Sequence, residues 1–186
     1  MSCIRYTEED LFTFAFRNGN DKELLEILIK DFGLDVNWRK HNFYDTLLYQ
    51  AFKIDLDLAK YLISKGACVN ASLGGYPENE NSHGYMSILD VVSGFRSLDG
   101  VGNEWLKQLG AISFENLPED QKEKVIKAVD FTKQASDEKY LYRTAEQAKL
   151  SVMLAPEKVQ EKLKGFLSCC EIVTVDEIQN KSKNGR

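Results

Sequence analysis

The sequence predicts an all-α protein, an α-solenoid of helix–turn–helix repeats with short hairpin loops, followed by C-terminal helices. The first observation is that apolar residues recur every three or four positions on two segments within Thr46–Ala71. The second is Gly66, which follows the later segment directly, where glycine commonly ends a helix in the left-handed conformation. The third is repetition, because Gly33 and Gly66 are 66 − 33 = 33 residues apart and Asn37 and Asn70 have the same separation.

The segment Thr46–Ala71 also opens with Thr-Leu-Leu-Tyr-Gln-Ala, a Thr-x-Leu-x-x-Ala pattern. This opening, the 33-residue period and the recurring Gly and Val-Asn pairs together resemble the ankyrin repeat. The resemblance covers residues 9–112, as repeats at about 9–42, 43–75 and 84–112. It implies a stack in which hairpin tips and first helices line a surface that binds other proteins, and it implies no catalytic activity.

The first repeat matches the family least closely. Residues 10–16 read Asp-Leu-Phe-Thr-Phe-Ala-Phe, in which the Thr, Pro and His of the family opening are all replaced. Three phenylalanines on one short helix are more than an internal repeat needs, so we expect this to be a terminal capping repeat. A second helix is expected over 22–30, with one extra residue, Asp31, before Phe32-Gly33.

The third repeat carries an insertion. Residues 87–92 resemble a repeat opening and residues 105–111 resemble a close, but the glycine interval is 110 − 66 = 44. The third repeat is therefore eleven residues longer than the 33-residue period, and these residues must form an insertion. Two segments are rich enough in Gly, Asn, Ser or Pro to be loops, 72–85 and 97–103, and the sequence does not choose between them.

Residues 113–178 are expected to form a helical extension. A helix starts at 116–120, and Val125, Ile126 and Val129 give it an apolar stripe that we expect to cover the open end of the last repeat. A second helix is marked by apolar positions from Leu141 to Val152, and Pro156 opens a third. The alternative is that 144–170 is a degenerate fourth repeat. We further expect a short strand near 172–175 and a disordered tail over 179–186.

Composition narrows the choice of partner. The chain has 186 residues and a net charge of −5, and residues 1–112 carry 11 basic against 16 acidic residues, which accounts for the whole imbalance. An acidic repeat region disfavours nucleic acid and favours a partner protein with a basic patch. The sequence shows neither a signal peptide nor an 18-residue apolar run. We therefore expect a protein of the cytoplasm, or one delivered into a host cell cytosol, with no membrane span. We also expect a monomer.

Aromatic and charged residues in two loops and one helix are the candidate partner-binding residues, since Trp, Tyr and Arg dominate binding hot spots. They are Trp38, Arg39, His41, Tyr44, Tyr49, Lys53, Tyr76, Glu78 and Tyr85. For each group a structural role is the alternative. Trp38 and Phe43 are alternatively packing residues, Arg39 to His41 a solvated turn, Tyr49 a substitute for the family's structural His, and 72–85 a plain insertion.

The cysteines define the second function class. The chain has four, with no Cys-x-x-Cys pair and only two histidines, so neither a metal site nor a cofactor is expected. We therefore expect an adaptor, effector or inhibitor that is not an enzyme. The alternative is a small cysteine-dependent enzyme that pairs Cys169 or Cys170 with His41 or His83, although thiols at the end of an amphipathic helix are more usually structural.

Overall fold

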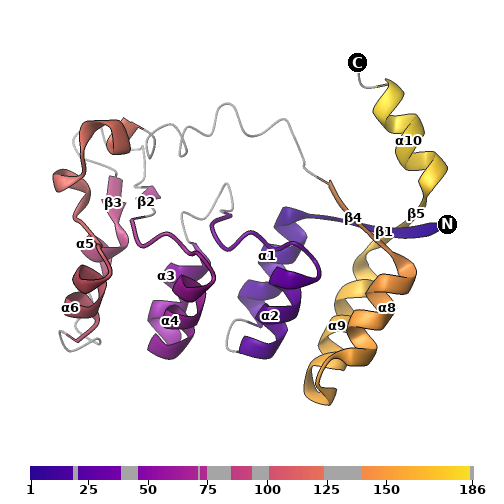
Figure 1. Cartoon of the computed structure of the whole chain (residues 1–186), viewed down its shortest axis with the longest axis horizontal. Helices are drawn as coiled ribbons and strands as arrows, with labels where there is room; N and C mark the ends of the chain where they lie inside the picture. Colours follow the sequence, from indigo (N-terminus) through magenta and orange to yellow (C-terminus); the bar gives the residue numbers. More distant parts are fainter. Residues whose placement is uncertain are drawn as a thin grey trace. The chain divides into compact units, whose positions relative to one another are not determined.

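The computed structural model of the chain (Figure 1) describes residues 1–18, 21–38, 46–70, 72–74, 85–93, 101–123 and 140–184. These ranges are mostly helical, but they also contain a three-stranded and a two-stranded antiparallel sheet, so the all-α prediction missed the strands. The chain divides into two compact units, a terminal unit of residues 1–35 and 138–186 and a central unit of residues 36–137. Within the described ranges, no helix has the length and apolarity needed to cross a membrane.

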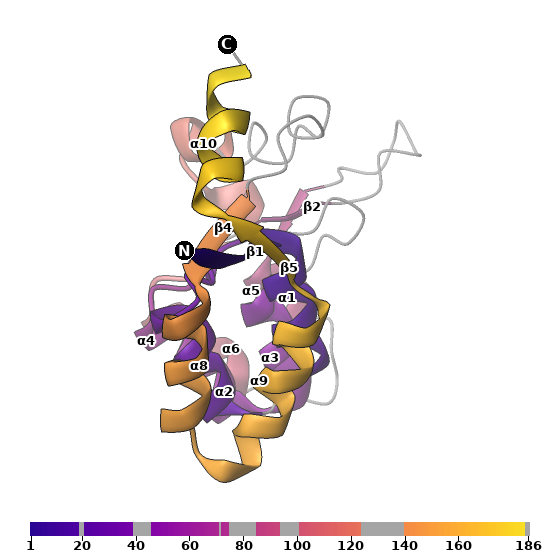
Figure 2. The same ribbon diagram turned by 90° about the vertical axis from the view of Figure 1, so that its right-hand side faces the viewer.

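The terminal unit combines both ends of the chain. Its N-terminal part is β1 (Ser2–Thr7), α1 (Glu8–Arg17) and α2 (Lys22–Lys30). Its C-terminal part is β4 (Tyr140–Thr144), α8 (Ala145–Leu154), α9 (Glu157–Cys169), β5 (Glu171–Thr174) and α10 (Val175–Asn184). The three strands form one antiparallel sheet in the order β4-β1-β5, so the N-terminal strand lies between two C-terminal ones (Figure 2).

The register of this sheet assigns side chains to its two faces. Ile4 pairs with both Arg143 and Ile172, which places these three residues on one face. Arg5 pairs with Glu171 and Tyr142 on the opposite face. Successive residues of a strand alternate between faces, so Val173 shares the Arg5 face.

The central unit holds two helix pairs. The first is α3 (Leu47–Ile54) with α4 (Leu56–Ser64), and the second is α5 (Ile88–Ser93) with α6 (Val101–Gln108). Between the pairs, β2 (Ser72–Gly74) and β3 (Tyr85–Ser87) form the two-stranded sheet, and a short 3-10 helix, η2 (Phe114–Asn116), follows α6. The ends of the 72–85 segment, expected to be loop throughout, are therefore strands.

The first helix of each pair begins at a hydroxyl residue. In α1, the Thr7 hydroxyl accepts a hydrogen bond from Asp10 N at 3.0 Å, and the Asp10 carboxylate accepts one from Thr7 N at 2.8 Å. The same reciprocal arrangement joins Thr144 to Gln147 at the start of α8. Thr46 and Ser87 cap α3 and α5 through the backbone N–H groups of Tyr49 and Asp90. These caps satisfy N–H groups that a helix start leaves unpaired.

Each second helix in residues 1–112 ends at a glycine in the left-handed region, Gly33, Gly66 or Gly110, with φ of 78°, 95° and 85°. A glycine adopts this conformation without a steric penalty. The residue after each glycine donates back into the helix, from Ala67 N to Leu62 O at 3.0 Å, from Ala111 N to Leu106 O at 2.9 Å and from Leu34 N to Leu28 O at 2.9 Å. The last bond spans 34 − 28 = 6 residues rather than five, which confirms the extra residue expected near Asp31.

An aromatic cluster forms the core of the terminal unit. The ring of Phe166 on α9 lies 5.7 Å from that of Tyr6, 5.8 Å from that of Phe32 and 4.9 Å from that of Phe14, measured between centroids. The Tyr6 hydroxyl donates to the Phe32 carbonyl at 3.0 Å, and burial raises the pKa of this phenol to about 12. The phenylalanine-rich helix α1 therefore packs against α9. The prediction that the first repeat has no neighbour on its outer side is wrong.

Polar contacts reinforce the packing of the C-terminal pair, α8 and α9, against the first repeat. Lys162 on α9 pairs with Asp21 at 2.8 Å, and Lys158 pairs with Glu23 at 3.1 Å. Arg143 donates to the Asp31 carbonyl and to the Ser151 hydroxyl, and its guanidinium lies 5.2 Å from the Phe32 ring centroid.

These contacts correct the role assigned to the extension. Residues 140–174 pair with and pack on the first repeat, not on the last, so the expected position of the cap is wrong for this part of the chain. The proposed contact residues Val125, Ile126 and Val129 lie outside the described residues. Leu141 belongs to β4 rather than to a helix, whereas the helix after Pro156 and the strand near 172–175 are confirmed. The expected disordered tail is also wrong, because α10 continues to Asn184.

Replacing Phe166 with alanine should selectively destabilise the terminal unit. Phe166 is 5% exposed and contacts three aromatic rings, so the substitution leaves a cavity that costs about 3–5 kcal/mol of the free energy of unfolding. Leu154→Ala is the matched control, since Leu154 is 77% exposed and should cost less than about 0.5 kcal/mol. Urea denaturation followed by circular dichroism measures both. Equal stability of the two variants would contradict this description of the core.

Candidate protein-binding edge

Two segments that hold predicted binding residues, 39–45 and 75–84, lie outside the described residues. The described residues before the first are Asn37 and Trp38, and Asn70 and β2 stand before the second. We call this region, consisting of Trp38 and the β2–β3 pair, the hairpin edge. Its geometry is set by the two asparagines that stand before these segments.

The Asn37 side chain joins its own turn to the next one along the chain. Its amide nitrogen donates to the Gly66 carbonyl at 3.0 Å, and its amide oxygen accepts from Cys68 N at 2.8 Å. The turn after α4 is thus held on both its donor and its acceptor side. Trp38 is the next residue and is half-buried. The two hydrogen bonds of Asn37 therefore constrain the backbone position at which Trp38 begins.

Asn70 repeats this arrangement one repeat later. Its amide nitrogen donates to the Gly110 carbonyl at 3.1 Å, and its oxygen accepts from Ile112 N at 2.9 Å. Because the same four atoms are used in both places, the two segments follow equivalent points of consecutive repeats. The residue at the corresponding position of the third repeat, four after Gly110, is Phe114, which cannot form this clamp.

The second segment is closed at its base by β2 and β3. Ser72 pairs with Ser87 and Gly74 with Tyr85, and the connecting residues 75–84 lie outside the described residues. Ser87 is fully buried, and it anchors the returning strand through the Asp90 carboxylate, which accepts from Ser87 N at 2.8 Å.

The Asp90 carboxylate also connects this strand to the segment after α6. It accepts a hydrogen bond from Phe114 N at 2.9 Å. Burial alone would raise the pKa of Asp90, but hydrogen bonds from Ser113, Phe114 and Ser87 outweigh that effect and lower the pKa. The carboxylate is therefore held in its ionised form as the fixed centre of the hairpin base.

The structure places four of the nine predicted binding residues. Trp38 is half-buried at the hairpin edge, and Tyr85 starts β3 opposite Gly74. Lys53 lies in α3. Tyr49 is only 8% exposed, so it belongs to the core of the central unit and is wrong as a surface contact. The other five lie outside the described residues, and they are Arg39, His41, Tyr44, Tyr76 and Glu78.

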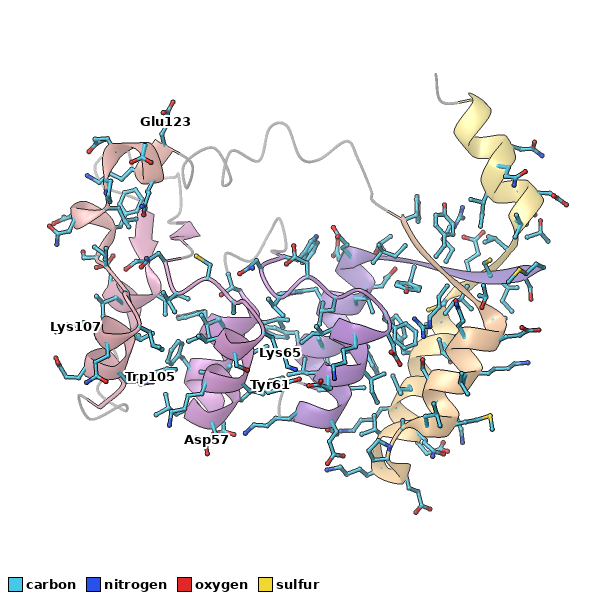
Figure 3. All side chains as sticks on the ribbon, viewed as in Figure 1. Asp57, Tyr61, Lys65, Trp105, Lys107 and Glu123 are labelled. Atoms are coloured by element: carbon cyan, nitrogen blue, oxygen red, sulfur yellow. The ribbon has the colours of Figure 1, made fainter. Side chains whose placement is uncertain are left out.

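A second surface of the central unit was not identified from the sequence. Trp105 on α6 lies 6.0 Å from Phe52, measured between ring centroids, and Lys60 on α4 lies 5.7 Å from the Trp105 centroid (Figure 3). We call the surface formed by Trp105 and Lys60 the α4–α6 face. At the C-terminal end of α4, the C-cap residue Lys65 lies 5.2 Å from the Tyr61 ring centroid.

The described residues show the surroundings of the cysteines but not those of the two histidines, so the structure does not test the predicted cysteine–histidine pair. Burial raises the pKa of the Cys170 thiol to about 12, with smaller contributions from the charges of Asp10 and Cys169. A thiolate, not a thiol, is the nucleophile in cysteine chemistry, so Cys170 is inert at neutral pH. Cys169 is exposed rather than core, and both histidines lie outside the described residues. The described ranges contain no metal-binding cluster of three or more His, Cys, Asp or Glu.

Thiol labelling should separate the four cysteines into two classes. Iodoacetamide at pH 7.5 should modify the exposed Cys68 and Cys169 rapidly, and the buried Cys3 and the proton-retaining Cys170 slowly. Peptide mapping by mass spectrometry reads each site, and a urea-unfolded sample gives the rate with all four accessible. Rapid labelling of Cys170 in the native protein would instead support the alternative function, a cysteine-dependent enzyme.

Comparison of the chain with family models, curated proteins and solved structures gave no match.

Proposed function

We propose that this protein is an ankyrin-type binding module, acting as an adaptor, effector or inhibitor that binds another protein through the hairpin edge. The observation that carries the proposal is the repeated asparagine clamp. The Asn37 and Asn70 side chains make the same pair of hydrogen bonds in consecutive repeats, and each stands directly before a loop. A rigid scaffold with positioned loops is a common way to present binding residues.

Local geometry supports assignment to a repeat architecture. Each helix pair in residues 1–112 starts at a hydroxyl cap and ends at a glycine with positive φ, as a helix–turn–helix unit requires. The pair α8 and α9 fits a degenerate fourth repeat, since it has the same kind of cap at Thr144 and packs on the first repeat. A solenoid of this kind buries apolar faces only by stacking.

Charge favours a partner with a basic patch. The repeat region carries the chain's whole charge of −5, and opposite charge on the partner accelerates association. The same charge disfavours nucleic acid, which needs a basic surface. We infer a monomer in the cytoplasm or in a host cell cytosol, without membrane insertion.

Within the hairpin edge, the aromatic residues are the proposed anchors. Trp38 is fixed by the adjacent clamp, and Tyr85 is fixed by its pairing in β3. The other predicted residues complete the proposed surface, and they are Arg39, His41, Tyr44, Lys53, Tyr76 and Glu78. Buried Tyr49 is excluded from the surface.

Substitutions at the hairpin edge should weaken partner binding without unfolding the protein. The partner is first captured with the full chain from the native cell or a candidate host cytosol, identified, and purified. Trp38→Ala and Tyr76→Ala should each cost about 2 kcal/mol, which is a roughly 30-fold rise in Kd. Glu78→Lys should slow association and reduce its salt dependence, because a rim charge acts mainly on the association rate. Biolayer interferometry measures both quantities.

Tyr61→Ala provides the matched control, because Tyr61 is a half-buried aromatic residue of α4 and is not one of the proposed binding residues. It should leave Kd within about twofold of the wild-type value. Circular dichroism is recorded for each variant, since Trp38 also has contacts within the protein. If Tyr61→Ala weakens binding and both edge variants bind as wild type, the partner uses a surface that includes α4 and the proposed site is wrong.

A further inference from the structure

The strand β5 is an edge of the three-stranded sheet in the terminal unit. It pairs with β1, and in the described part of the chain no other strand adjoins it. An edge strand presents backbone N–H and C=O groups that can pair with an additional strand. Proteins commonly block such edges with proline or lysine or keep the edge strand very short. β5 reads Glu-Ile-Val-Thr and has neither proline nor lysine, but it is four residues long and its Thr174 N–H already donates to the Glu177 carboxylate at 2.6 Å, so Ile172 carries the N–H group that an added strand would use.

The two faces beside this edge differ in chemistry. On one face Ile172 is 75% exposed, which is high for an isoleucine in a strand. On the other face a small recess of about 70 Å³, partly open to solvent, lies between the sheet and α10. It is lined by Arg5, Glu171, Val173, Glu177 and Ile178. The recess therefore combines apolar side chains with carboxylates.

Charge at this edge is negative after internal pairing is counted. Arg5 is the one cation lining the recess, and its guanidinium is bonded to Glu171. Glu177 and the exposed Asp176 leave a net negative rim. A second copy of the chain would bring the same acids toward this rim, which is unfavourable for strands that pair directly. A lysine or arginine fits better, because its aliphatic stem suits Val173 and Ile178 and its cation suits the carboxylates.

We propose that the outer edge of β5 binds an extended peptide in which basic and apolar residues alternate. The peptide adds as a fourth strand, and its backbone pairs with β5. An apolar side chain then lies beside Ile172, and the two neighbouring basic side chains lie on the recess side, because successive side chains of a strand alternate. This surface belongs to the terminal unit, so the inference does not depend on the hairpin edge.

A short synthetic peptide tests the proposal on the full chain. The probe is fluorescein-labelled Lys-Val-Lys-Val-Lys-Val, and fluorescence anisotropy at 0.15 M salt, about the physiological value, measures its binding. Wild-type protein should bind it saturably, and Ile172→Lys should weaken binding at least about tenfold by removing the apolar contact and adding a repelling charge. Leu154→Lys is the matched control, because Leu154 is 77% exposed on α8 and the charge change is identical. It should change Kd less than about twofold.

Two N-methylated versions of the peptide separate strand addition from simple charge attraction. A strand donates every second N–H to a given neighbour, so methylation of one alternate set should abolish binding and methylation of the other should not. Equal binding of both peptides, or equal weakening by Leu154→Lys and Ile172→Lys, would overturn the proposal. So would absence of binding to the wild type, or a wild-type dimer in light scattering that Ile172→Lys converts to a monomer, because a second copy would then occupy the edge.

Discussion

The structure of the central unit depends on the primary amides of Asn37 and Asn70. Each amide supplies one donor and one acceptor, and each meets a glycine carbonyl and a backbone N–H of the next turn. Aspartate lacks the donor and leucine lacks both groups, so neither can replace asparagine here. Each clamp joins the turn that carries the asparagine to the next glycine turn along the chain.

In the terminal unit, the C-terminal part of the chain pairs and packs with the N-terminal part. β1 pairs with both β4 and β5, and Phe166 contacts Tyr6, Phe14 and Phe32. The central unit is thereby an insertion between residues 35 and 138. Both ends of the chain must come together before this core exists, so formation of the terminal unit depends on contacts between residues more than 100 positions apart, which fold slowly.

Much of this architecture could be predicted from local signals. Helix starts at Thr46 and Pro156, the turns at the glycines and the extra residue near Asp31 are encoded within a few positions. The predictions that failed concern contacts between residues that are far apart in the sequence. Nothing within Ser2–Thr7 signals that it pairs with residues 140–144. The three phenylalanines of α1 were interpreted as a sign of a terminal repeat, whereas one of them, Phe14, stacks on Phe166 of α9. Burial of Tyr49 was also missed, since a tyrosine in a family's histidine position reads equally well as core or surface.

Amide hydrogen exchange in Asn37→Ala and Asn70→Ala tests the clamp most directly. The amides of Cys68 and Ile112 each donate to one asparagine oxygen, at 2.8 and 2.9 Å. Loss of that acceptor should accelerate exchange at the paired amide by about tenfold or more, given a net worth of roughly 1 kcal/mol per hydrogen bond and the partner left unsatisfied. Asn70→Ala should thus accelerate amide exchange at Ile112 and leave exchange at Cys68 unchanged, and Asn37→Ala should do the reverse. Unchanged exchange at both amides, or equal acceleration of both by either variant, would contradict the account.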